Sequence, residues 1–110
     1  MTLAAARYEL AGKIAAAGYR VVDDPRNLNP PCVLIVPVEG ITRVTYCAFR
    51  ADVEVYVLAA PPGNADAMDW ALDTTEALLD LCSGDGARRA RYQVAGQELP
   101  GYVLTVQITN

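Results

Sequence analysis

The stretch from Arg43 to Ala60, RVTYCAFRADVEVYVLAA, constrains the fold more than any other feature of the sequence. Side chains of a β-strand point alternately to its two faces. Every odd position from Cys47 to Ala59 is apolar, whereas the even positions include Arg50, Asp52 and Glu54. Because strands are usually about 3–10 residues long, the stretch predicts either one long, bent strand or a two-stranded ribbon. Its apolar face needs a covering layer.

Two segments with helical periodicity can supply that layer. Residues 3–17 place apolar side chains three and four positions apart, and Gly18 is suited to end this helix. Residues 64–82 repeat the pattern, with Asn64 as a good N-cap. The apolar stripe of this second helix is expected to hold Met68, Ala71, Leu72, Thr75, Leu78, Leu79 and Cys82.

The remaining apolar runs are short enough to be strands. They are expected at residues 19–22, 32–36, 87–95 and 102–109, the last two forming a hairpin around a loop at 96–101. The order is helix, strand, strand, long strand, helix, strand, strand. This order predicts a single α+β domain over residues 1–110, with a mainly antiparallel sheet and two helices packed on one face.

Composition and charge exclude several classes of function. The net charge of −4 argues against nucleic-acid binding as the main task, because phosphate contacts need clustered Lys and Arg. No apolar run reaches the ~18 residues of a membrane span, and charges interrupt the N-terminal segment too early for a signal peptide. The chain is therefore expected to stay in the compartment where it folds, most simply the cytoplasm.

Catalytic and metal-binding motifs are missing from the sequence. There is no histidine, which excludes Ser–His and Cys–His triads, and no C-x-x-C pair for zinc. Asp52 and Glu54 mimic an acid–base pair, but strand neighbours of this kind sit side by side in water, and Arg50 is available to pair with Asp52. We expect no enzyme and no cofactor. Each of the three cysteines, Cys32, Cys47 and Cys82, falls at an apolar position and is expected to be a reduced core residue.

The polar side of the second helix is strongly acidic. It lacks Lys and Arg and carries Asp66, Asp69, Asp73, Glu76 and Asp80. Carboxylates three and four positions apart on a helix repel one another. The face is either a solvated surface or one that meets a basic surface of a neighbour, such as Arg88, Arg89 and Arg91 of another copy. A metal site is a weaker third interpretation, because helical carboxylates converge badly without loop ligands.

The loop at residues 23–31, DDPRNLNPP, contains three prolines, which fix the backbone. It is either a plain connector or a rigid contact loop. In the second case Arg26 and Leu28 are the side chains available for contacts.

Three segments, AAAGYRVVDDPRNLNPPCVLIVP, YCAFRADVEVYVLAAPPGNADAMDWALD and LPGYVLTVQITN, resemble tail terminator proteins of long-tailed phages that infect GC-rich actinobacteria. The likeness spans almost the whole chain. It is one of pattern: a helix, an AGY start to a strand, a Pro-rich loop before an apolar strand, and a C-terminal PGY strand. Lambda-like terminators are α+β domains that form six-fold rings at the head-proximal end of the tail tube, stop its polymerisation and dock the head connector.

The resemblance implies a structural virion protein that is assembled in the host cytoplasm. Its partners would be further copies of itself, the major tail tube protein and the head–tail stopper or connector, with DNA only as passing cargo. The candidate ring interface comprises Arg50, Asp52, Glu54, Asp69, Asp73, Glu76, Asp80, Arg88, Arg89 and Arg91. The candidate contacts to tube or stopper come from the loops at 23–31 and 37–42, through Arg26, Leu28, Glu39 and Ile41.

Two alternatives stay open at the level of sequence. One is another neck protein, such as a stopper or connector, which shares the ring symmetry and differs in its place in the virion. The other is a cytoplasmic α+β binding module, dimeric through a sheet edge, which predicts a closed apolar cavity and two-fold symmetry. An enzyme is a third and weaker option.

Overall fold

The computed structural model describes residues 2–23, 29–36, 40–61, 64–82, 84, 86–94 and 96–109. Three of the candidate contact residues, Arg26, Leu28 and Glu39, lie outside these ranges. The fourth, Ile41, is described and exposed.

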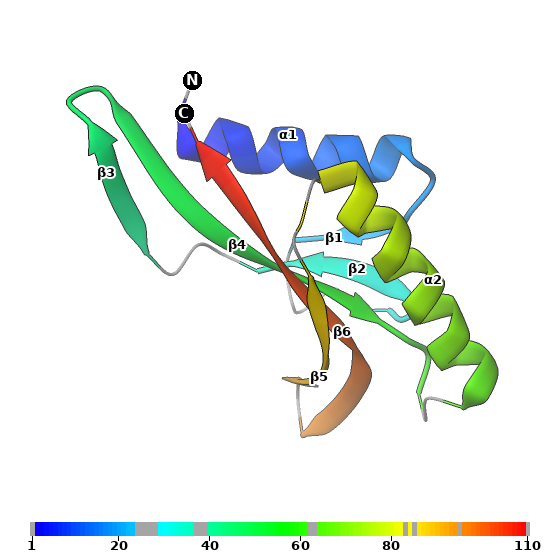
Figure 1. Cartoon of the computed structure of the whole chain (residues 1–110). Helices are drawn as coiled ribbons and strands as arrows, with labels where there is room; N and C mark the ends of the chain where they lie inside the picture. Colours follow the sequence, from blue (N-terminus) through cyan, green and yellow to red (C-terminus); the bar gives the residue numbers. More distant parts are fainter. Residues whose placement is uncertain are drawn as a thin grey trace.

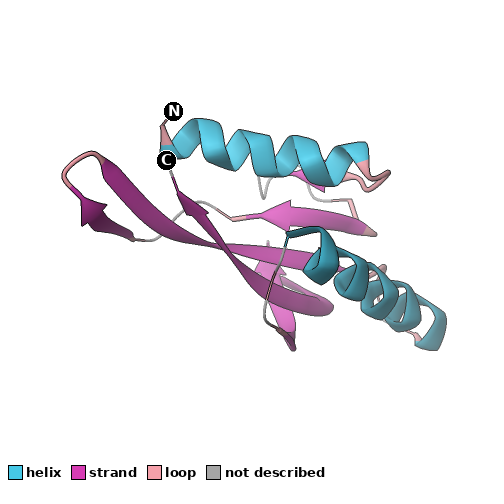
Figure 2. Ribbon diagram, turned by 45° about the horizontal axis from the view of Figure 1, so that its top comes forward, coloured by secondary structure: helices cyan, strands magenta, loops and turns pink. Residues whose placement is uncertain are grey.

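Two helices cover one face of a six-stranded sheet (Figures 1 and 2). The helices are α1 (Leu3–Ala16) and α2 (Ala65–Cys82). The strands are β1 (Val21–Val22), β2 (Cys32–Ile35), β3 (Ile41–Thr45), β4 (Ala48–Leu58), β5 (Ala87–Val94) and β6 (Gln97–Thr109). The strand order is β1-β2-β4-β6-β5, with β3 also paired to β4. Only β1 and β2 run parallel, so the α+β class with a mainly antiparallel sheet is confirmed.

The stretch from Arg43 to Ala60 forms a two-stranded ribbon, so the single long strand in the expected element order is wrong. The chain turns at Tyr46 and Cys47, and β3 returns alongside β4. Most β3 residues pair with β4 residues of the same parity, as in Ile41 with Ala51. Partners directly opposite each other share a face, so Arg43 lies beside Phe49. The regular apolar alternation begins only at Cys47, because the odd positions Arg43 and Thr45 before the turn are polar.

The second correction concerns the loop expected at 96–101. Most of it belongs to β6, which begins at Gln97 and pairs with β5 from Gln97 to Leu104. Leu99 is buried there, in a small apolar cluster on the sheet face away from the helices. The hairpin formed by β5 and β6 is confirmed, with its turn at Gly96.

The main core lies between the sheet and the helices. The helices contribute Leu10 and Ile14 from α1 and Ala71 and Leu78 from α2. The sheet contributes Val33, Ile35, Ala51, Val53, Val55, Val57, Ala59, Leu104, Val106 and Ile108. A smaller cluster on the other face contains Val22, Cys32, Leu34, Leu58 and Leu99. All four residues of β2 are buried between the two clusters, as the unbroken apolar run CVLIV predicts.

Helix ends follow the sequence signals. The Asn64 side chain accepts a hydrogen bond from Ala67 N at 2.9 Å, which confirms the expected N-cap of α2. Gly18, with φ of 98°, lies just beyond α1. One residue departs from the expected stripe: Leu72 is 49% exposed, because the sheet contacts the turns that carry Ala71, Thr74, Thr75 and Leu78 instead.

A pair of leucine substitutions tests this placement of α2. Leu78 is fully buried in the main core, so Leu78→Ala is expected to lower the free energy of unfolding by about 2–5 kcal/mol. Leu72→Ala, on the same helix, is expected to change it by less than about 1 kcal/mol, because the side chain is already half in water. Urea unfolding of both variants measures the difference, and equal losses would contradict the observed helix orientation.

Candidate functional site

The outer side of α2 is an acidic face without internal compensation. Its five carboxylates, Asp66, Asp69, Asp73, Glu76 and Asp80, are all exposed. Within the described part of the chain, none of them forms an ion pair. Leu72 lies among them, between Asp69 and Glu76 on the helix surface, and adds an exposed apolar side chain. We call these six residues the acidic face of α2.

A projecting hairpin at the other end of the molecule is the second notable surface. Strand β6 ends opposite Arg50, so β3 and the first residues of β4 extend beyond the rest of the sheet (Figure 1). We call residues 41–50 the arm. Every residue of β3 is exposed, and three large apolar side chains face water: Ile41 is 62% exposed, Val44 54% and Tyr46 95%. The only charged residues of the arm are Arg43 and Arg50.

Local contacts give the arm a defined shape. The Arg43 guanidinium lies 4.8 Å from the centre of the Phe49 ring, directly across the hairpin. The same side chain donates a hydrogen bond from Nη1 to the carbonyl oxygen of Tyr46 at 3.1 Å. A cation–π contact of this exposed type stabilises by about 0.5–1 kcal/mol. The turn therefore presents Tyr46 to the solvent from an organised hairpin.

The sheet face away from the helices carries the charged even positions of β4. Arg50 and Asp52 are exposed, and they form no ion pair with each other or with any other described residue. Glu54 is half-buried and accepts a hydrogen bond from the Tyr56 hydroxyl at 3.1 Å. Burial and the Glu54 carboxylate raise the pKa of Tyr56. The Tyr56 ring in turn packs against Tyr92 of β5, with ring centres 5.1 Å apart.

Two open grooves border this charged surface. The larger, of about 570 Å³, is lined by Arg50, Asp52, Glu54 and Thr105 among others. The smaller, of about 450 Å³, lies beside the end of α2 and includes Asp52 and Thr105. Neither is the closed apolar cavity that a dimeric small-molecule binding module would need.

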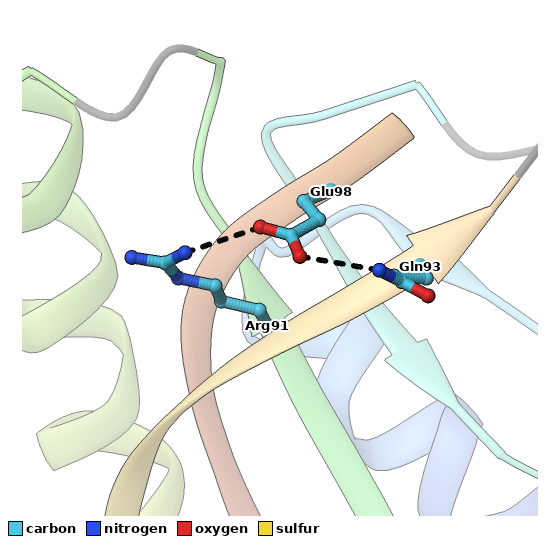
Figure 3. A network of polar contacts seen from close by, with 3 residues as sticks. All are labelled: Arg91, Gln93 and Glu98. Atoms are coloured by element: carbon cyan, nitrogen blue, oxygen red, sulfur yellow. Dashed lines mark hydrogen bonds and ion pairs between the residues drawn. The ribbon is translucent and has the colours of Figure 1, made fainter. Parts of the chain in front are cut away.

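The three arginines of β5 are exposed, but they do not form one patch. Arg88 pairs with Val103 and faces the side of Tyr56, whereas Arg89 and Arg91 point to the opposite side of the strand. Arg91 already forms an ion pair with Glu98 at 3.1 Å, and Gln93 donates to the other oxygen of Glu98 (Figure 3). An exposed ion pair of this kind contributes little stability. The arginines of β5 therefore lie on both sides of the strand, and Arg91 already has an acidic partner. This makes β5 a poor basic surface for another copy.

The three cysteines are free thiols in three different environments. Cys32 is buried, as expected, and Cys82 is half-buried. The expectation of a core position is wrong for Cys47, which is exposed in the turn of the arm. Burial raises the pKa of both the Cys32 and the Cys82 thiol.

Thiol reactivity is expected to follow these environments. Near pH 8, one thiol per native chain should react rapidly with a disulfide reagent, because Cys47 is exposed while burial raises the pKa of the other two thiols. The other two should react only slowly until the protein is unfolded. Counting released thiolate against time measures this, and Cys47→Ser should remove the rapid phase. Three rapid thiols in the native protein would contradict the buried position of Cys32 and the half-buried position of Cys82.

Within the described ranges, no three His, Cys, Asp or Glu side chains converge as a metal site would require. Among the same residues, no helix has the length and apolar character to cross a membrane.

No protein-family model matches the chain, and a search of curated proteins finds no match.

The structure thus places the candidate interface residues in three regions: α2, the charged side of β4, and β5. Sequence reasoning did not include Val44, Tyr46 or Leu72 among the candidate contact residues. Val44 belongs to β3, which among the described residues pairs only with β4, and Tyr46 lies in the turn that follows. Leu72 was assigned to the buried stripe. No local signal distinguishes an apolar residue of a projecting hairpin from one in a core strand.

Proposed function

We propose that this protein is a structural virion component of the tail terminator type. It forms a ring, of six copies by the resemblance, at the head-proximal end of a phage tail tube. The ring ends tube polymerisation and provides the docking surface for the head connector or stopper.

The observation that carries the proposal is the separation of charge on the molecule. The acidic face of α2 is exposed and forms no ion pair with the residues that the structure describes, while the basic arm lies at the opposite end (Figures 1 and 2). A closed ring repeats one heterologous contact, so each copy needs two different complementary surfaces at separate places. A two-fold dimer needs only one self-complementary surface. The distribution of charge therefore favours head-to-tail assembly.

The passage of DNA is consistent with the sign of the charge. The chain has a net charge of −4. If Asp52 and the half-buried Glu54 lined the lumen, their carboxylates would repel the phosphates of DNA and allow it to pass without sticking. This assignment of the lumen is part of the proposal.

A second candidate is another neck protein, because a stopper or connector has the same ring symmetry. Deletion of the gene from the phage that encodes it separates the two. Loss of a terminator is expected to give tail tubes of uncontrolled length. Tubes of normal length beside unjoined heads would overturn the terminator assignment and favour a stopper.

A further inference from the structure

The arm and the acidic face of α2 are complementary in both charge and apolar character. We propose that the arm of one copy binds the acidic face of α2 in the next copy, with Tyr46 packed against Leu72. The inference rests on the head-to-tail ring of the proposed function and names the two surfaces that make its repeated contact.

The arm has the features of a surface that is covered in an assembly. Its outer strand, β3, has one paired edge, toward β4, and all of its residues are exposed. Strand edges with exposed apolar side chains are sites where other chains bind. Tyrosine and arginine, which dominate the energetics of protein interfaces, both occur here as Tyr46, Arg43 and Arg50. The hairpin contacts of Arg43 organise the arm before binding, which lowers the entropy lost on association.

The acidic face of α2 carries charge opposite to that of the arm. It presents five carboxylates and no basic residue, against two arginines and no acidic residue in the arm. Leu72, half exposed among the carboxylates, is an apolar contact point for the aromatic ring at the tip. A central apolar contact surrounded by charged pairs is the usual composition of a specific interface.

The position of the two surfaces makes the contact intermolecular. In both views the arm extends from one end of the sheet and α2 lies at the other end (Figures 1 and 2). The arm cannot reach the acidic face of its own chain, so it is available to a neighbour, whose own arm is then free for a third copy. Repetition of this contact closes a ring when the rotation per copy permits. The divided arginines of β5 are the competing partner for the acidic face.

Disulfide trapping tests the contact directly, because the arm already carries the exposed thiol Cys47 next to Tyr46. Leu72→Cys places a second thiol on the acidic face. Mild oxidation of this variant is expected to give a ladder of covalent oligomers on a non-reducing gel, and Cys47→Ser in the same background should abolish it. Arg89→Cys is the matched control on exposed β5 and should give no ladder. An Arg89→Cys ladder as strong as that of Leu72→Cys would show that Cys47 does not select the acidic face, and it would overturn the arm contact.

The solution mass of the same sample before oxidation separates two kinds of failure. Oligomers that form without a disulfide between positions 47 and 72 overturn the arm contact but leave the ring of the proposed function. A two-fold dimer without the disulfide overturns both.

A pair of tyrosine substitutions provides a second readout. Tyr46→Ser is expected to weaken self-association at least about tenfold, because an aromatic anchor at the centre of the contact is lost. Tyr8→Ser removes another exposed tyrosine, on α1, and should leave association unchanged. Equal association constants for the two variants would overturn the role of Tyr46.

Discussion

Gly101→Ala is expected to lower the free energy of unfolding by about 3 kcal/mol or more, or to prevent folding, because position 101 has no room for a side chain. A Cβ atom there would collide with the backbone carbonyl oxygen of Val57 and lie 3.1 Å from the Cα of Leu58. These neighbours are backbone atoms of β4, the strand that pairs with β2, β3 and β6, so they cannot move aside as a side chain can. Chemical denaturation measures the loss.

Gly12→Ala is the matched control for this experiment. Gly12 lies in α1, and a Cβ atom there meets no atom within 4 Å. Alanine is the better helix former, so this substitution should raise stability by about 0.5–1 kcal/mol. The same substitution is therefore expected to lower the free energy of unfolding at position 101 and to raise it at position 12. A Gly101→Ala protein as stable as the parent would contradict the close approach of β6 to β4.

Reversal of charge on α2, by Asp73→Lys together with Glu76→Lys, is expected to weaken self-association roughly tenfold or more per contact. Two attractions to a basic surface become repulsions, and a ring repeats this loss at every contact. The isolated domain should unfold at the same temperature or a higher one, because the repulsion among the helix carboxylates is relieved by a few tenths of a kcal/mol per pair. Sedimentation velocity and thermal unfolding separate the two effects.

The control for charge reversal makes the same change in net charge at another location. Glu9→Lys on α1 and Asp23→Lys after β1 alter two other exposed carboxylates by the same amount. This double variant should associate like the parent protein. Added salt should weaken the parent assembly, since exposed charge pairs are screened. Unchanged association of the α2 variant would mean that the acidic face is only a solvated surface.

Sequence patterns predicted the parts of the fold that depend on local periodicity. The stripe of α1, the cap at Asn64 and the fully buried strand β2 all follow from the spacing of apolar residues and from one capping side chain. They were predictable because the signal and the structure it determines lie within a few residues of each other.

Other features depend on contacts between segments that are distant in the sequence, and local patterns do not predict such contacts. The turn at Tyr46 and Cys47 contains no Gly, Pro, Asn or Asp, so none of the usual turn residues marks it. Conversely, the Pro and Gly residues of GQELPG resemble a loop, yet Gly101 is required inside β6 by the closeness of β4.

Part of the candidate site could also be predicted from local sequence patterns, and part could not. The exposure of the acidic face follows from helical periodicity, as expected. The exposure of Leu72 and of the arm could not be predicted. The first depends on which side of α2 contacts the sheet, and the second depends on where β6 ends beside β4.

Electron-microscope class averages of the purified protein, with its solution mass, test head-to-tail assembly most directly. Six copies of the 11.8 kDa chain give about 71 kDa, and the averages should show a closed ring with six-fold symmetry. The contact between neighbours should be the same at all six positions and should join two different surfaces. A two-fold particle, in which identical surfaces face each other, would contradict the proposed function and support the dimeric binding module.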